Sequence, residues 1–410
     1  MRGERGKIPL LMKKNIKITP EGTRDLLFEE CTSHKTIISK IADVFKQRGF
    51  HEVITPCLEF YDLFRMDNCS IRQESMFKLT DLHGRLMAVR PDSTLPIARM
   101  ISVRLPNAER PIRLFYNQKV YRNNPDLRGN SNEIMQAGIE LVGVGGLRAD
   151  LEIITTAVEA LSANISDFRI ELGHAGFFSA IIKQLNAGED IKEDIKTAIK
   201  SKNYSALNMI LDSQTESSAV SALRSLPRLF GGEEIFANAS SVCICSEVQT
   251  CLDYLKKVYE CLCEYGLKDK LTVDLGLVQE NDYYTGIIFS GYVEGAGDAV
   301  AVGGRYDNLL ENFSCPMPAA GFGMNIDEIT RVIIEKDESI GHIKPADVLV
   351  HALDGYEIKA INYSEQLSQK NITCENSVFT ALDDAKAYAL SKGIAELCVV
   401  AESIETIKLN

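Results

Sequence analysis

The stretch Gln136-Ala137-Gly138-Ile139-Glu140 sets two polar side chains among residues that otherwise favour a buried strand. Side chains alternate between the two faces of a strand, so Gln136, Gly138 and Glu140 share one face. Burying a Glu beside a Gln costs free energy unless both are paired. We therefore expect either a salt bridge or a bound ligand on this face.

Two further stretches place polar residues next to predicted strands. Arg90-Pro91-Asp92-Ser93-Thr94 sets a carboxylate and a hydroxyl two residues apart, which suits an ammonium group but is also common turn chemistry. Asn281-Asp282-Tyr283-Tyr284-Thr285-Gly286 carries two adjacent tyrosines, which would point to opposite faces of an ordinary strand. Acidic and tyrosine side chains together favour a cationic, hydrogen-bonding amine as ligand.

Sequence patterns divide the 410 residues into five parts. Residues 1–17 form an N-terminal extension, in which Met12 is an alternative start. Residues 18–173 and 265–338 alternate helices and strands as two parts of one core, and residues 174–264 between them are mostly helical. Residues 343–410 alternate strands and helices, which is typical of a small α/β domain.

Charge and hydropathy narrow the classes of partner. The chain has 45 Lys and Arg against 57 Asp and Glu, a net charge of −12. Proteins that bind nucleic acids or anionic membranes need cationic surfaces, so the balance disfavours both. No apolar run reaches the roughly 18 residues of a spanning helix, and the first residues lack a secretory signal. We expect a cytoplasmic protein.

The sequence gives no pattern that predicts a metal or a cofactor. It lacks a Walker loop, an HExxH pattern and a Ser/His/Asp arrangement. The pairs Cys243/Cys245 and Cys261/Cys263 have one intervening residue, whereas structural zinc sites favour two to four. Apolar residues near the second pair repeat at helical spacing, so we interpret this region as a packed amphipathic helix.

Six blocks, together with Pro56, resemble the catalytic core of the histidyl-tRNA synthetases, which are class II aminoacyl-tRNA synthetases. In chain order the blocks are Gly22-Thr23-Arg24-Asp25, Arg90 to Thr94, Arg113-Leu114-Phe115-Tyr116 with Tyr121-Arg122, Gln136 to Glu140, Asp282-Tyr283-Tyr284, and Gly303-Gly304-Arg305-Tyr306-Asp307. The resemblance implies an α+β fold with an antiparallel sheet flanked by helices. It also implies a helical insertion and a small C-terminal α/β domain that resembles a truncated anticodon-binding domain.

The resemblance further implies a histidine-binding site whose positions this sequence keeps. Asp92 is shorter than the Glu usual in the family. The matching positions are Asp92, Thr94, Arg122, Gln136, Glu140, Tyr283 and Tyr284.

At the positions that bind ATP in the synthetases, this sequence has different residues. Gln279 stands where the synthetases have a catalytic arginine, and Glu328 stands where motif 3 ends in an arginine that holds ATP. After Arg122, Asn123-Asn124-Pro125 replaces a basic and aromatic stretch. Adenylate formation needs positive charge aimed at the phosphates, so the resemblance implies that aminoacylation is lost and that no catalytic residue remains.

A chain that keeps the histidine site without the ATP chemistry is similar to the regulatory subunits of ATP phosphoribosyltransferase, a family of synthetase paralogues. That resemblance implies a non-catalytic role in the first step of histidine biosynthesis. The implied partners are the short-form catalytic subunit in a hetero-oligomer, histidine as feedback effector, and a second copy of the chain in a dimer. The alternatives are a divergent synthetase-like ligase and a tRNA- or histidine-sensing protein.

Overall fold

The computed structural model describes residues 17–66, 71–124, 131–242, 245–279, 283–337 and 340–409. The chain divides into two compact units, Met1–Gly341 and His342–Asn410. Apart from Lys17, the expected N-terminal extension and the alternative start Met12 lie outside the described residues. None of the described helices combines the length and apolar composition needed to cross a membrane.

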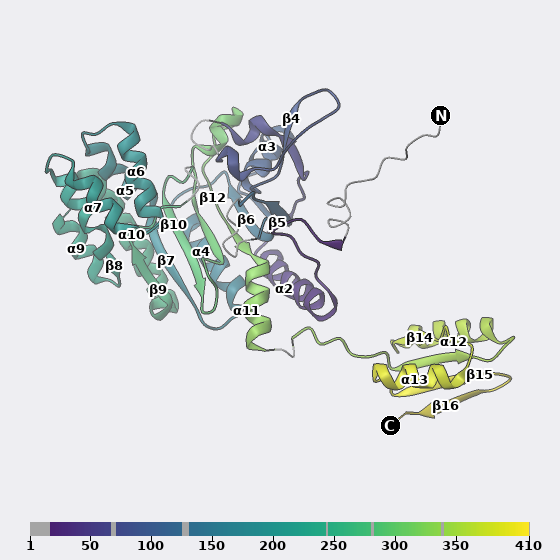
Figure 1. Cartoon of the computed structure of the whole chain (residues 1–410). Coiled ribbons are helices and arrows are strands. Elements are labelled where there is room, and N and C mark those ends of the chain that lie inside the picture. The colour runs from purple at the N-terminus through teal and green to yellow at the C-terminus, as the bar shows by residue number, and fades with distance from the viewer. Residues whose placement is uncertain are drawn as a thin grey trace, which may run out of the picture. The chain divides into compact units, whose positions relative to one another are not determined.

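A nine-stranded sheet forms the centre of the first unit, in the order β1-β5-β6-β12-β11-β10-β7-β9-β8 (Figure 1). Most neighbours are antiparallel, while β1–β5 and β7–β9 are parallel. The expected antiparallel sheet flanked by helices is therefore confirmed, with short parallel pairs toward its edges. Its strands are β1 (His51–Glu52), β5 (Ile112–Tyr121), β6 (Glu133–Val142), β7 (Phe168–His174), β8 (Phe230–Gly231), β9 (Leu271–Asp274), β10 (Ile287–Val293), β11 (Ala301–Arg305) and β12 (Ala319–Asn325).

Strands β5 and β6 carry apolar side chains toward both faces because both faces are covered. Phe115 and Ile139 belong to the main apolar core on one face. Leu114 and Tyr116 belong to a second core on the other face. Glu140 pairs across the strands with Leu114, so its side chain enters the second core.

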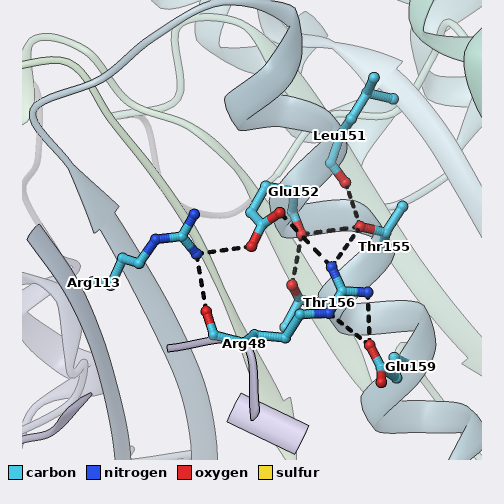
Figure 2. Close-up of polar contacts among 7 residues, drawn as sticks. All are labelled: Arg48, Arg113, Leu151, Glu152, Thr155, Thr156 and Glu159. Atoms are coloured by element: carbon cyan, nitrogen blue, oxygen red, sulfur yellow. Dashed lines mark hydrogen bonds and ion pairs between the residues drawn. The ribbon is translucent and has the colours of Figure 1, made fainter. Parts of the chain in front are cut away.

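Helices α2 (Phe28–Gln47), α4 (Leu147–Ser162) and α11 (Ile326–Lys336) pack on one another and cover the face of the main core. Figure 2 shows the ion pairs that hold the end of α2 against α4 and β5. Arg48 Nε donates to Glu159 Oε2 at 2.7 Å. Arg113 donates to Glu152 Oε1 at 2.8 Å and to the carbonyl oxygen of Arg48 at 3.2 Å. These contacts fix the register of α2 along the sheet.

The opposite face carries α3 (Thr94–Arg104), the short helix η7 (Leu309–Phe313) and a three-stranded sheet of order β2-β4-β3. Strand β4 (Leu86–Val89) pairs with β2 (Leu58–Phe60) and β3 (Lys78–Thr80) and leads directly into α3. Arg90 in this connection is buried and donates to the carbonyl oxygens of Thr55, Pro56 and Lys119. The buried arginine thereby joins the small sheet to the large one.

Six described α-helices between β7 and β9 gather at one end of the large sheet (Figure 1). Helix α10 confirms the predicted stripe, because Leu255, Val258, Tyr259 and Leu262 are buried along it, while Cys251 is half-buried. Cys243 lies outside the described residues. These helices are α5 (Ala175–Gln184), α6 (Glu189–Lys200), α7 (Tyr204–Asp212), α8 (Ser218–Ser225), α9 (Glu234–Val242) and α10 (Ser246–Leu262).

The second unit is a small α/β domain with a four-stranded sheet of order β14-β13-β15-β16. Strand β13 is parallel to β14 and β15, and β16 is antiparallel to β15. Helices α12 and α13 bury separate apolar clusters on the two faces of this sheet. The elements are β13 (Val348–Ala352), α12 (Glu357–Gln369), β14 (Cys374–Asn376), α13 (Leu382–Lys392), β15 (Glu396–Val400) and β16 (Ile404–Lys408).

Candidate functional site

A buried carboxyl group, Glu140 of β6, forms the centre of the candidate site. Only 2% of Glu140 is exposed. The hydroxyl of Thr94, the first residue of α3, donates to Glu140 Oε1 at 2.7 Å. The hydroxyl of Tyr306, the residue after β11, donates to Glu140 Oε2. Three elements far apart in sequence thus meet at one carboxylate.

Glycines on the neighbouring strand make room for this side chain. Gly321 of β12 pairs across the strands with Glu140. A Cβ atom at Gly321 would lie against Oε2 of Glu140 and the carbonyl oxygen of Ile139. Strand β12 therefore needs glycine at this position, because the side chain of Glu140 occupies the space that a Cβ atom would take.

Three tyrosines, Tyr283, Tyr284 and Tyr306, form an aromatic cluster beside Glu140. The ring centroids of Tyr283 and Tyr284 are 4.8 Å apart, and those of Tyr283 and Tyr306 are 5.4 Å apart. Tyr283 and Tyr306 are buried, and Tyr284 is half-buried. Tyrosine rings of this kind give a ligand apolar faces together with hydroxyl groups.

A second acid, Asp92, is buried in the connection from β4 to α3. Its Oδ1 accepts the backbone N–H of Leu95 at 2.9 Å, which satisfies one free donor at the start of α3. Burial raises the pKa of Asp92, while the bond to Leu95 and the charge of Arg122 act in the opposite direction. Arg122 Nε donates to the carbonyl oxygen of Pro91 at 3.4 Å, close to this acid in the chain.

The electrostatics of the site favour a cation. Burial, together with the nearby charge of Asp92, raises the pKa of Glu140 to about 8, while the bonds from Tyr306 and Thr94 act in the opposite direction. A positive ligand group would stabilise both carboxylates and lower their pKa values. The site therefore suits an ammonium or imidazolium group better than a phosphate.

Gln136 lies two residues before Gly138 on the same face of β6. Its Oε1 accepts from the hydroxyl of Tyr116 at 3.2 Å. Burial raises the pKa of Tyr116, and the charges of Glu140 and Asp92 raise it as well. The structure thus brings Asp92, Thr94, Glu140 and the tyrosine pair together, with Gln136 and Arg122 at the margins.

Tyr306 and Tyr116 are site residues that the sequence analysis did not assign. Both belong to blocks that resemble the synthetases, and this was the signal available for them. Their roles depend on cross-strand register: Tyr116 is opposite Gly138, and β11 pairs with β12 at Gly304 and Gly321. Register between distant strands is not visible in a single sequence.

Gln279 and Glu328, where the resemblance implies that arginines have been lost, make other contacts. Gln279 Nε2 donates to Ser290 Oγ at 3.0 Å. Glu328, in the first turn of α11, pairs with Arg331 one turn later at 2.6 Å, which lowers the pKa of the carboxyl. Glu328 also accepts the backbone N–H of Gly297 at 3.3 Å. Neither side chain supplies a positive charge.

Comparison with known proteins relates the whole chain to two groups of proteins. A sequence model of the histidyl-tRNA synthetase family matches residues 22–329. The ATP phosphoribosyltransferase regulatory subunit of Clostridium novyi is 37% identical over 402 residues, which cover 97% of this chain and 95% of that protein. That of Clostridium kluyveri is 38% identical over 382 residues, which cover 92% and 97% respectively.

Solved structures of related proteins share the fold of this chain. An ATP phosphoribosyltransferase regulatory subunit/histidyl-tRNA synthetase from Bacillus halodurans C matches with a TM-score of 0.82 and 28% identity, covering 94% of this chain and 99% of that one. A histidyl-tRNA synthetase from a Nostoc strain shares the fold with a TM-score of 0.72 at 19% identity, covering 96% and 97%. With more than a third of its residues identical over nearly its whole length, the chain belongs to the family of ATP phosphoribosyltransferase regulatory subunits, built on the fold of the histidyl-tRNA synthetases.

Proposed function

We propose that this chain is the regulatory subunit of a cytoplasmic ATP phosphoribosyltransferase and has no catalytic site of its own. It supports a short-form catalytic subunit, a glycosyltransferase, in the first step of histidine biosynthesis, and it carries histidine feedback. The observation that supports this most is the buried cluster of Glu140, Thr94 and Tyr306 beside Asp92. It offers carboxylates, hydroxyls and aromatic rings, and it belongs to a chain whose relatives are named regulatory subunits.

Histidine fits the chemistry of this cluster. Its ammonium group and imidazole are cationic or hydrogen-bonding, and two buried carboxyl groups would gain from such a partner. The ring faces of Tyr283 and Tyr284 suit the imidazole. Feedback requires only that histidine bind one state of the complex more tightly, by about 1–3 kcal/mol.

Gln279 and Glu328 argue against aminoacylation. Loss of one donor that stabilises developing charge typically lowers a rate by about 10²–10³. Gln279 is neutral, and Glu328 is a carboxylate whose partner is Arg331. Phosphates would be repelled at the second position, so we expect no histidine-dependent exchange of pyrophosphate into ATP.

We also propose that tRNA is not a partner. Residues 343–410 carry six Lys and Arg against ten Asp and Glu, a net charge of −4. A surface with that balance does not release phosphate counterions. A synthetase anticodon-binding domain of this architecture would need the opposite sign.

The test mixes the chain with a short-form catalytic subunit and measures phosphoribosyl transfer from phosphoribosyl pyrophosphate to ATP. We expect the rate to rise with added chain until a fixed stoichiometry is reached. Pyrophosphate exchange with histidine is measured in parallel and should stay at background. A transfer rate unchanged by the chain, or a clear exchange activity, would refute the proposal.

A further inference from the structure

A buried ion pair lies between the candidate site and the helices that follow β7. Asp150 of α4 has no exposed surface. Its Oδ1 accepts from Nε and Nη2 of Arg305 at 2.9 and 2.6 Å. Its Oδ2 accepts from the hydroxyl of Tyr254 on α10 at 2.6 Å. Both carboxylate oxygens are thus engaged, one by β11 and the other by α10.

Arg305 is also tied to the residues that line the site. Tyr306 follows it directly and donates to Glu140. The carbonyl oxygen of Arg305 accepts the backbone N–H of Thr285 at 2.8 Å, and Thr285 follows Tyr284. A ligand that shifts the tyrosines must therefore move Arg305 or break these bonds.

The tyrosine segment reaches helix α5 by a second route. The carbonyl oxygen of Gly286 accepts the backbone N–H of Ala175, the first residue of α5, at 2.9 Å. His174 caps α5 by accepting from Gly176 N at 3.1 Å, and its ring stands edge-on to Tyr254 with centroids 6.3 Å apart. Burial lowers the pKa of His174 to about 4, so this contact is between neutral rings near pH 7.

A Cβ atom at Gly286 would lie 2.9 Å from Cδ of Arg305. The tyrosine segment and the arginine stem are therefore in direct contact, with no side chain between them. Tightly packed elements of this kind shift between discrete arrangements and do not deform gradually.

We infer that the Arg305–Asp150–Tyr254 link couples occupancy of the histidine site to helices α5 and α10. Tyr254 and Asp150 act as positioning residues, because they hold Arg305 and through it Tyr306. The inference rests on the proposed function, which supplies histidine as the ligand. Because coupling is reciprocal, a protein bound on α5 or α10 would change histidine affinity by the same factor.

Hydrogen exchange of the full chain, with and without L-histidine, tests the coupling. Tyr254→Phe removes the hydroxyl that reaches Asp150 and leaves the pair with Arg305 intact. Tyr259→Phe removes a hydroxyl from the same helix on its buried apolar stripe and is the matched control. Urea unfolding verifies that both variants are folded, and histidine affinity is measured by calorimetry.

We expect histidine to slow exchange in α10 and in residues 283–286 of the wild type and of Tyr259→Phe. In Tyr254→Phe, histidine should still protect residues 283–286 but no longer protect α10. The dissociation constant of histidine from Tyr254→Phe should be about 2- to 30-fold higher than from the wild type. This is the range of coupling effects measured for residues outside a binding site.

Equal protection of α10 in Tyr254→Phe and the wild type would overturn the coupling and leave the proposed function standing. Equal loss in Tyr254→Phe and Tyr259→Phe would also overturn it, because the loss would then not depend on Asp150. Absence of histidine binding by the wild type would refute the proposed histidine site, and the coupling with it.

Discussion

Glu140 is deeply buried, and the histidine binding that we propose for it needs a negative charge. Its pKa is raised from 4.5 to about 8, so the folded chain holds a proton that the unfolded chain releases. For an acid with a raised folded pKa, the free energy of unfolding is largest below pH 4.5 and falls as pH rises toward 8. The site therefore destabilises the unliganded protein near neutral pH.

We expect Glu140→Gln to flatten this pH dependence. Between pH 5.5 and 8 the wild type should lose about 3 kcal/mol more of its unfolding free energy than the variant, at about 1.4 kcal/mol per pH unit. Urea unfolding across this range is the measurement. Glu335→Gln, whose side chain is 59% exposed on α11, is the control. Parallel curves for Glu140→Gln and the wild type would contradict the assignment.

Histidine binding should release a proton from Glu140. At pH 7 the free site is mostly protonated, and a cation beside it lowers the pKa, so affinity should rise with pH up to about 8. Calorimetry in two buffers of different ionisation enthalpy counts the proton. The wild type should release close to one proton more than Glu140→Gln, and equal release would argue that the cation does not bind at this carboxyl.

Much of the site could be predicted from residue identity, and the remainder could not. The resemblance assigned Glu140 and Thr94 to one site, and their side chains are hydrogen-bonded although they lie 46 residues apart. Tyr306 was not assigned, because its contact with Glu140 depends on how β11, β12 and β6 align. Such long-range register follows from packing of the whole sheet.

Among the secondary-structure elements, β12 must have no side chain at Gly321 for Glu140 to fit beside it. We expect Gly321→Ala to destabilise the chain by about 1–3 kcal/mol, because a methyl group would overlap Glu140 and the backbone of β6. It should also abolish the histidine response. Gly297→Ala is the matched control, since nothing lies within 4 Å of its added Cβ. Thermal unfolding of both variants is the measurement, and equal melting temperatures would contradict the expectation.

The small sheet presents an apolar outer face to solvent. Cross-strand pairing places Phe60 and Leu79 opposite Met87, and the two outer side chains are 48% and 37% exposed. A contiguous apolar face marks an interaction site, and Arg85, whose guanidinium carbon lies 4.9 Å from the centroid of the Phe60 ring, is opposite in sign to the net charge of −12. We propose that the self-association implied by the resemblance uses this face.

Negative charges introduced on this face should prevent two copies of the chain from associating. We propose that the wild type is a dimer, and Phe60→Glu with Leu79→Glu should convert it to a monomer, as light scattering after gel filtration would measure. Val378→Glu, at a 90% exposed position of the second unit, should leave the mass unchanged. A double variant that keeps the wild-type mass would place the contact elsewhere.

Element boundaries were less predictable than element types. The sequence favours a strand at residues 299–302, whereas β11 is Ala301–Arg305 and includes two glycines that resemble a loop. Those glycines are needed because Phe322 and Ile288 lie where a Cβ atom would be. Strand β16 was not predicted, because its side chains are mostly exposed and show no apolar alternation.

For the whole molecule, we propose that a synthetase fold keeps its amino-acid site, while Gln279 and Glu328, which the resemblance assigns to the ATP site, carry no positive charge. The first unit holds the complete cluster around Glu140, and the second unit has its own sheet and cores. The net charge of −12 and the replacements Gln279 and Glu328 point the same way, toward a small cationic ligand. We propose that regulation depends on protein partners and not on chemistry within this chain.

The most direct test of this account is histidine inhibition of phosphoribosyl transfer by the reconstituted complex. Wild type and Glu140→Gln are compared with the same catalytic subunit. We predict that both support transfer, and that the variant needs at least about tenfold more histidine for half inhibition, since a hydrogen-bonded charge is lost. Identical inhibition curves would contradict the account, because histidine would then act at a site other than the cluster around Glu140.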